Sequence, residues 1–330
     1  MDTQSILEWL ASEDHPAARY LAARDLLSAP PDSLDRWHAA VGTWSPLAAI
    51  LALQKTDGGF PSHTKQAPMG NTFAAIRLME RCGMDVRDEP VARVIGLLED
   101  GYAGHGAVSY NSGGSGILPC YVGLVTRALI RMGAADSPVV TTSLDWIVAH
   151  QRYDRRDVRA GGVEPWTYRA VNNYGCWDSV SCYHGVVGTL GALAAVPADT
   201  RTAGQRERIL DAIDYLREHR VYRRTGDGKP IFRTSLQFSF FHGYRSHVLD
   251  VLEWLADADP SLADERWVKE AIADVEALSR HGKIPLATNA TTHLVDPLAL
   301  ERVGEPSPLL TVQWLRLRRA FGLADVPAAC

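Results

Sequence analysis

The sequence predicts an all-α protein in which six helical hairpins can close a ring. Three observations lead to this prediction. Apolar residues recur at helical spacing in segments rich in Ala and Leu, and few stretches alternate as strands do. The segments return at a regular interval along the chain. The links between them are alternately short and long.

We expect twelve helices, which lie at residues 3–11, 17–27, 46–54, 71–82, 90–99, 120–132, 138–149, 181–195, 205–219, 244–257, 264–280 and 308–321. Every second helix, beginning with the one at 17–27, starts about 50 to 65 residues after the helix two places before it. Each repeating unit is then one helical hairpin. Because six hairpins use almost the whole chain, we expect residues 1–330 to form a single domain.

The links between the predicted helices fall into two classes. Four are short, at Gly83–Glu89, Gly133–Ser137, Val196–Gly204 and Ala258–Ala263. Five others, those within a hairpin, are long and contain aromatic residues, and they run over 55–70, 100–119, 150–180, 220–243 and 281–307. Loops of this length are usually functional when they are not disordered. In an up-down ring all long links emerge on one face, so we expect the polar chemistry there.

Composition excludes several classes of partner. The chain has 330 residues, of which 46% are hydrophobic, so it can form a large core. Lys and Arg number 34 against 39 Asp and Glu, and no block of like charge is present, so nucleic acid is not an expected partner. No apolar run reaches the roughly 18 to 20 residues of a membrane helix. Five scattered cysteines do not form a disulfide framework, and we expect a cytoplasmic protein.

One short motif carries a family resemblance. Residues 53–60 read LQKTDGGF, which resembles the Gln-x-x-Asp-Gly-Gly-Trp/Phe repeat signature of the terpenoid cyclase and protein prenyltransferase superfamily, to which squalene-hopene cyclases belong. This resemblance implies an (α/α)6 toroid whose inner helices surround a hydrophobic cavity. It also implies that the motif residues are structural and tie helix ends together, and these are Gln54, Asp57, Gly58, Gly59 and Phe60.

Other motifs of that superfamily are absent. No Asp-x-Asp-Asp sequence is present, and Asp257-Ala258-Asp259-Pro260 lies at an expected helix end. Protonation-driven cyclisation of that type is therefore not supported. Asp154-Arg155-Arg156-Asp157 does not supply an aspartate-rich site for magnesium and diphosphate. The Gly113–Gly116 segment lacks the Lys of a phosphate-binding loop, so no nucleotide cofactor is expected.

A polar cluster precedes the helix expected at 181–195. The β subunits of protein prenyltransferases bind zinc with an Asp and a Cys at the start of one inner helix and a His at the start of the next. The resemblance therefore implies Asp178, Cys182 and His242 as zinc ligands. The local spacing differs, because this chain has Asp-x-x-x-Cys in place of Asp-x-Cys.

The same residues allow an interpretation without metal. A thiolate, an imidazole and a carboxylate with one open position suit catalytic zinc. Alternatively, the positive end of a helix dipole favours the thiolate of Cys182, and His184 or His242 can complete a nucleophilic or acid–base pair. A Cys at such a position is also often a small core residue, and a His is often a helix cap.

Further candidates lie in the long links. His105, between two glycines, is a candidate for proton transfer over the cavity. Aromatic side chains that suit the wall of an apolar substrate site are Trp166, Trp177, Tyr183, Phe241, Tyr244 and Tyr110.

These observations favour an enzyme that acts on a small hydrophobic molecule, isoprenoid- or polyketide-like, by cyclase, isomerase or lyase chemistry. Zinc is a candidate cofactor. Two alternatives stay open at the level of sequence. One is a non-catalytic toroid that binds a lipid or a peptide, and the other is a protein similar to a prenyltransferase β subunit. The sequence does not indicate an oligomeric state.

Overall fold

The computed structural model describes residues 3–12, 14–62, 69–103, 106–111, 116–153, 181–239, 243–288 and 300–323. Within these ranges the regular elements are helices, and β-structure is limited to isolated bridges. The prediction of an all-α protein is therefore confirmed.

Thirteen α-helices form from the described residues. They are α1 (Thr3–Leu10), α2 (Pro16–Asp25), α3 (Pro31–Thr43), α4 (Ser45–Leu51), α5 (Gly70–Cys82), α6 (Glu89–Gly101), α7 (Pro119–Arg131), α8 (Pro138–His150), α9 (Tyr183–Ala195), α10 (Ala203–Glu218), α11 (Val248–Ala258), α12 (Arg266–Leu278) and α13 (Pro308–Ala320). Many of them begin with Pro in the first turn, where its missing N–H leaves no helical hydrogen bond unmade.

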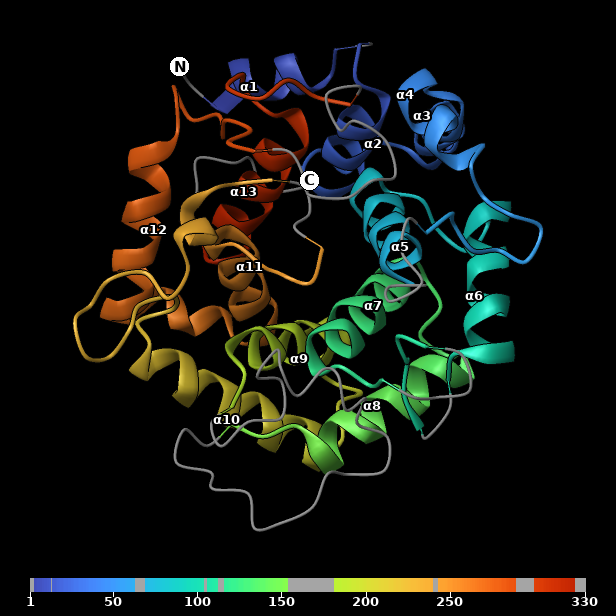
Figure 1. The fold of residues 1–330 in the computed structure, drawn as a ribbon. Helices are drawn as coiled ribbons and strands as arrows, with labels where there is room; N and C mark the ends of the chain where they lie inside the picture. The colour runs from blue at the N-terminus through green and yellow to red at the C-terminus, as the bar shows by residue number, and fades with distance from the viewer. Residues whose placement is uncertain are drawn as a thin grey trace.

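Six helices lie nearest the centre of the molecule. Figure 1 shows that α2, α5, α7, α9, α11 and α13 are central, whereas α6, α8, α10 and α12 are peripheral. Each central helix contacts the next one along the chain, and α13 returns to contact α2. The contacts of the central helices therefore form a closed cycle. Central and peripheral helices also pair in chain order, as in α5 with α6 and α7 with α8.

The closest helix packing joins α7 to α9 through two glycines. A Cβ atom on Gly123 would lie 2.1 Å from the backbone carbon of Gly188, and one on Gly188 would lie 3.0 Å from the carbonyl oxygen of Cys120. The absence of side chains therefore lets the two backbones touch. Because α9 is enclosed in this way, its residues from Tyr183 to Ala194 are all buried, which agrees with its hydrophobic character on every side.

The LQKTDGGF motif forms a turn that ties two helices together. The Nε2 atom of Gln54 donates to the carbonyl oxygens of Gly58 and Pro90, each at 2.9 Å, and Pro90 lies in the first turn of α6. The Oδ1 atom of Asp57 accepts from the backbone N–H of Gly59 at 2.8 Å. Gly58 has φ +88°, and a Cβ there would meet the carbonyl oxygen of Arg93 at 2.3 Å. These contacts are structural.

The helices differ most from the sequence prediction at two places, and α4 also ends three residues earlier than expected, at Leu51. Helix α3 was not expected, and only its residues His38 and Val41 are buried. The helix expected at 244–257 begins at Val248. His247 caps it, since its Nδ1 atom accepts the backbone N–H of Asp250 at 3.3 Å.

No helix of the described residues is long and apolar enough to cross a membrane.

Replacement of Gly123 by Ala tests the close packing of α7 on α9. Ala usually stabilises a helix interior relative to Gly by about 0.5 to 1 kcal/mol. At Gly123 the added methyl group meets the backbone of Gly188, so we expect a loss of about 1 to 3 kcal/mol in the free energy of unfolding, measured by urea denaturation.

Gly96→Ala in α6 is the matched control, because a Cβ there has no atom within 4 Å. This variant should be as stable as the wild type or more stable. Equal effects of the two substitutions would contradict the packing described here.

Candidate functional site

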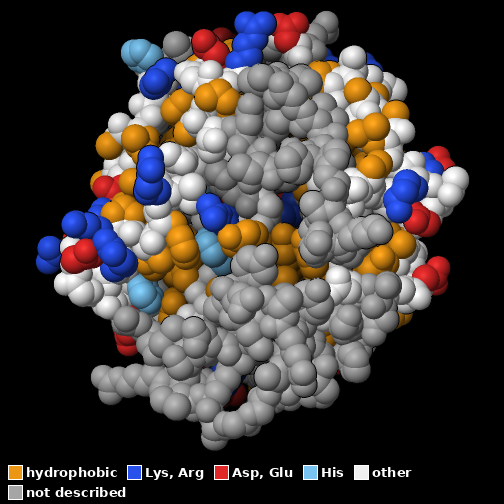
Figure 2. All heavy atoms as spheres, viewed as in Figure 1, with side chains coloured by type: hydrophobic (Ala, Val, Ile, Leu, Met, Phe, Trp, Pro, Cys, Tyr) orange, Lys and Arg blue, Asp and Glu red, His pale blue; other side chains and the backbone are white. Residues whose placement is uncertain are grey.

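Aromatic side chains gather at the N-terminal ends of the central helices. They come from the first turns of α5, α7 and α9 and from the links that precede α7 and α11. We call this group the aromatic rim, and its members are Phe73, Tyr110, Tyr121, Tyr183, His184, Phe232 and Tyr244. Figure 2 shows hydrophobic side chains beside a histidine near the centre of the viewed face.

The rings of the aromatic rim form a continuous series. Tyr121 stacks on Tyr110 with centroids 5.1 Å apart and lies 5.0 Å from Phe73. Tyr244 meets Tyr121 edge-on at 6.2 Å and His184 edge-on at 5.6 Å. Such offset and edge-to-face pairs are favourable arrangements of aromatic rings. The rim therefore presents an apolar surface that contains one imidazole.

His184 is the titratable group at the centre of this surface. Its ring stacks on Phe232 at 4.3 Å, with an angle of 19° between the planes. The residue is only 5% exposed, whereas its neighbour Tyr244 is 38% exposed. His184 is thus enclosed by aromatic rings and lies next to an accessible one.

The two tyrosines on the other side of the rim are hydrogen-bonded to each other. Burial raises the pKa of Tyr121 well above its ordinary value, and the nearby hydroxyl of Tyr110, which bonds to it, raises it further. Tyr121 therefore keeps its proton at neutral and alkaline pH. A phenol that gives its one O–H to a neighbouring hydroxyl can still accept a hydrogen bond from a ligand.

The structure brings together four of the residues singled out from sequence. Tyr110, Tyr183, His184 and Tyr244 all belong to the aromatic rim. Tyr183 has a packing role, because its hydroxyl donates to the carbonyl oxygen of Val221 at 3.0 Å and the residue is buried. Cys182 is the N-cap residue of α9 and is partly exposed.

The other sequence-predicted site residues lie outside the described residues, and they are His105, Trp166, Trp177, Asp178, Phe241 and His242. Their roles stay predictions. Cys182 is therefore the one residue of the expected zinc set whose position is described.

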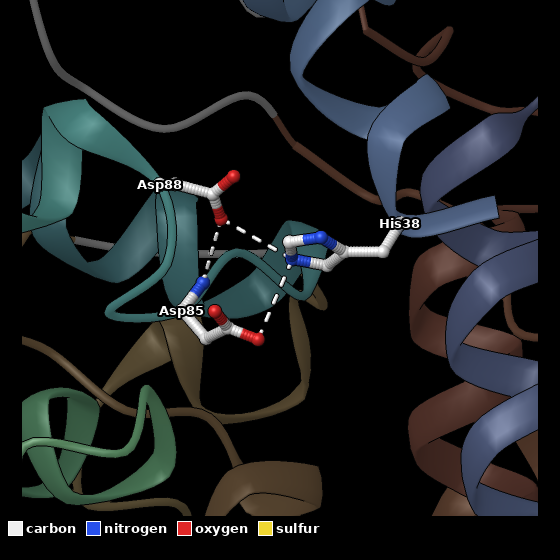
Figure 3. A group of neighbouring side chains, drawn as sticks. All are labelled: His38, Asp85 and Asp88. Carbon is white, nitrogen blue, oxygen red and sulfur yellow. Dashed lines mark hydrogen bonds and ion pairs between the residues drawn. The ribbon is translucent and has the colours of Figure 1, made fainter. Parts of the chain in front are cut away.

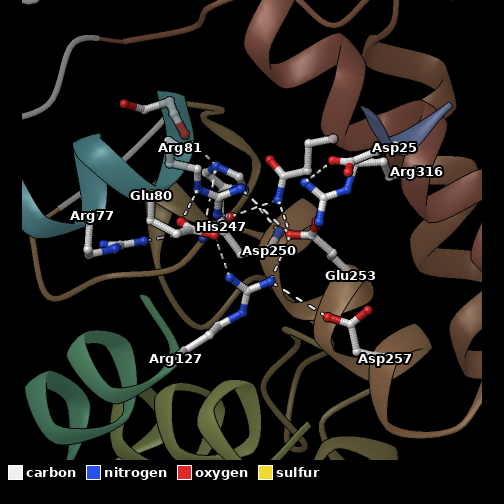
Figure 4. Close-up of polar contacts among 12 residues, drawn as sticks. Asp25, Arg77, Glu80, Arg81, Arg127, His247, Asp250, Glu253, Asp257 and Arg316 are labelled. Atoms are coloured by element: carbon white, nitrogen blue, oxygen red, sulfur yellow. Dashed lines mark hydrogen bonds and ion pairs between the residues drawn. The ribbon is translucent and has the colours of Figure 1, made fainter. Parts of the chain in front are cut away.

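Charged side chains meet across the central helices, as Figure 4 shows. They come from α2, α5, α7, α11 and α13. We call them the central ion cluster, and its members are Asp25, Arg77, Glu80, Arg81, Arg127, Asp250, Glu253, Asp257 and Arg316. The resemblance implies a hydrophobic cavity at this place, whereas the described side chains that meet here are charged.

Glu253 connects the most helices within this cluster. Its carboxylate lies 2.9 Å from Nη2 of Arg316, 3.4 Å from Nη2 of Arg127 and 3.6 Å from Nη1 of Arg81. Glu253 is 3% exposed. A buried charge of this kind is tolerated because opposite charges surround it, and removal of one partner is strongly destabilising.

The ion cluster also fixes part of the aromatic rim. The Nη1 atom of Arg77 donates to the carbonyl oxygen of Gly243 at 2.6 Å and to that of Arg245 at 3.3 Å. Tyr244 lies between these two residues. Arg77 is 4% exposed and thus has little freedom to move. The backbone that carries the ring of Tyr244 is therefore held by a buried guanidinium.

A separate group on the periphery contains an imidazole and two carboxylates (Figure 3). The Nε2 atom of His38 lies 3.2 Å from Asp88 and 3.5 Å from Asp85. The possible ligand atoms of these three side chains lie within 4.8 Å of one another, so they could share a metal ion. No other described group of His, Cys, Asp and Glu side chains is spaced in this way. Arg87 already bonds to both carboxylate oxygens of Asp85. The contacts present join α3 to the start of α6.

Sequence reasoning missed Tyr121 and the central ion cluster. A signal for the cluster is present, because charged residues recur every three or four positions in otherwise apolar helices. Examples are Arg77 with Arg81 in α5, and Asp250 with Glu253 and Asp257 in α11. The spacing alone does not show whether such a stripe faces solvent or the centre of the protein.

Comparison with known protein families, with curated proteins and with solved structures gives no match for this chain. Inferences about function therefore rest on the residues themselves and on the resemblance of the LQKTDGGF motif.

Elemental analysis of protein purified without a metal-affinity tag tests the zinc prediction. If Cys182 is a ligand, we expect about one zinc per chain, lost in Cys182→Ala. His38→Ala should keep the metal and serves as the control for the peripheral group. Metal that is retained in Cys182→Ala but lost in His38→Ala would move the site to His38, and metal-free protein would rule out both sites.

Glu80 predicts a specific pH dependence of stability. Burial alone would raise its pKa, but the guanidiniums of Arg127 and Arg81 outweigh this effect and lower the pKa from 4.5 to about 2. A carboxylate whose pKa is lower in the folded protein than in the unfolded chain stabilises the fold fully at pH values above the unfolded-state pKa. This stabilisation is lost as the pH falls through the folded-state pKa. We therefore expect the stability deficit of Glu80→Gln to shrink between about pH 4.5 and pH 2.

Urea denaturation at several pH values measures this deficit. Glu207→Gln is the control, because that exposed side chain lies outside the cluster. A Glu80→Gln deficit that stays constant over this range would contradict the assigned cause.

Proposed function

We propose that this chain is a single (α/α)6 toroid and an enzyme that converts a small, largely hydrophobic molecule by acid–base chemistry at the aromatic rim. The observation that carries the proposal is the enclosure of the His184 imidazole within a continuous series of aromatic rings. The closed cycle of contacts among the central helices supports the toroid.

The chemistry follows from the groups that the rim contains. An imidazole can accept and return a proton near neutral pH, which suits an isomerisation, a cyclisation or an elimination. Tyr121 keeps its proton, which bonds to Tyr110, and its oxygen can accept a hydrogen bond from the substrate. The rings of Phe232 and Tyr244 supply an apolar surface on either side of His184.

The central ion cluster defines where the substrate would lie. Charged groups fill the described part of the space between α5, α7, α11 and α13. An apolar molecule gains nothing from displacing paired charges. The proposal therefore places the substrate at the aromatic rim, above the cluster and not within it.

Zinc remains part of the proposal for the start of α9. There Cys182 would be a ligand together with Asp178 and His242, and the metal would supply Lewis-acid chemistry. The acid–base role of His184 does not depend on it.

Binding at the rim can be measured with the neutral fluorescent probe N-phenyl-1-naphthylamine, whose emission rises in apolar surroundings. We expect saturable binding to the wild type. Tyr121→Ala should weaken it about tenfold, because the loss of a stacked ring costs about 1.5 kcal/mol. Trp37→Ala on α3 is the control and should bind as the wild type does. Equal affinity for all three proteins would place the probe elsewhere.

Turnover can be tested with a mixture of compounds in place of a single substrate. An extract of apolar metabolites is incubated with the wild type and with His184→Gln, and mass spectrometry follows the consumption of each compound. We expect conversion by the wild type and its loss in the variant, with probe binding retained. Probe binding without conversion of any compound would favour the non-catalytic binding toroid instead.

A further inference from the structure

A pocket of about 430 Å³ lies at the opposite ends of the central helices from the aromatic rim. Asp25 and Arg131 are the last residues of α2 and α7, and Asp257 and Arg319 lie in the last turns of α11 and α13. All four line the pocket, together with Arg316 and Glu253 and three apolar residues. Four members of the central ion cluster are therefore part of the pocket wall, and these are Asp25, Glu253, Asp257 and Arg316.

Two arginines in the pocket have no carboxylate partner. Arg131 forms no hydrogen bond or ion pair with another described residue, although its side chain is exposed to the pocket. Arg319 donates to the backbone carbonyl oxygens of Asp25 and Leu26, at 2.9 and 3.4 Å. Among the arginines that reach this pocket, only Arg316 pairs with carboxylates of the described residues.

The carboxylates nearby are already engaged. Asp25 lies 2.6 Å from the guanidinium of Arg24, besides its contact with Arg316. Glu253 is shared among three arginines of the cluster. Asp257 lies 3.6 Å from Arg127. Asp257 and Glu253 attract Arg131, but no carboxylate of the described residues lies within ion-pair distance of Arg131 or Arg319.

At Arg131, repulsion from other guanidiniums together with burial outweighs the attraction of Asp257 and Glu253. The pKa of Arg131 is lowered from 12.5 to about 10, first by repulsion from the guanidinium of Arg316 and then by burial. The pKa of Asp257 is raised, by burial first and then by the charge of Glu253. The C-termini of the four helices that end here each carry about half a negative charge, and together they offset part of this repulsion.

We propose that this pocket binds a small oxyanion, a carboxylate or phosphate group, between the guanidiniums of Arg131, Arg316 and Arg319. Guanidinium groups present paired N–H donors that match the oxygens of both groups. The volume is that of a site for a small metabolite. The inference stands on residues other than those of the rim and is independent of the proposed activity there.

Calorimetric titration at low ionic strength with inorganic phosphate and, separately, with succinate tests the proposal. We expect one saturable site per chain for at least one of the two anions, and the tighter of the two identifies the preferred group. Arg131→Gln should weaken that binding by about tenfold. Arg318→Gln is the control, because Arg318 also lies in the last turn of a central helix but pairs with Glu276, which does not line the pocket.

Thermal unfolding separates this role from a purely structural one. Without anion, Arg131→Gln should unfold at the same temperature as the wild type or higher, since the repulsion from Arg316 and the burial cost that it removes outweigh the attraction to Asp257 and Glu253. The rise in unfolding temperature that phosphate or succinate gives the wild type should disappear in the variant.

Three results would overturn the proposal. The first is no saturable binding of either anion up to about 10 mM. The second is equal binding by Arg131→Gln and the wild type. The third is a lower unfolding temperature for Arg131→Gln with no response to anions in the wild type, which would assign Arg131 to the helix dipole alone.

Discussion

The buried ion pairs between the central helices are the constraint on which much of the rest depends. A charge removed from water must be compensated at close range, so Glu253 requires Arg81, Arg127 and Arg316 to remain around it. These side chains belong to α5, α7, α11 and α13, and their pairing fixes the relative positions of those helices. Apolar contacts tolerate sliding far better than charge pairs do, because they are not directional.

This constraint extends to both ends of the central helices. Towards the N-terminal ends, Arg77 holds the backbone on either side of Tyr244 and so positions one ring of the aromatic rim. Towards the C-terminal ends, Arg316 connects Glu253 to the wall of the pocket that contains Arg131. One end of the central helices is therefore apolar and aromatic, and the other is polar and rich in guanidinium groups. The two ends suit different ligands because the charges between them keep apolar molecules out of the middle.

Local sequence patterns predicted where most helices lie, but they predicted poorly which side chains contact one another. The expected helices at 71–82 and 308–321 agree with α5 and α13 to within one residue at each end, because long apolar periods and flanking Pro or Gly define them. Helix α3 was missed because it buries only His38 and Val41 and so lacks an apolar period. For the site, the sequence singled out Tyr110, His184 and Tyr244, which the fold brings together. It missed Tyr121, which joins them and whose position inside an apolar helix resembles ordinary packing.

The sequence by itself determined the all-helical fold class, the extent of most helices and the turn formed by Gln54 to Phe60, since these depend on contacts between residues close in the chain. Only the tertiary structure decided that charged stripes on four helices face one another, because a helical period gives the spacing of a stripe but not the direction in which it points. It also decided that Arg131 lies in a pocket without an ion pair to the described residues, while Arg127, one turn earlier on the same helix, pairs with Glu80 and Glu253. A difference of that kind depends on residues 47 and 126 positions away along the chain, and no local pattern records it.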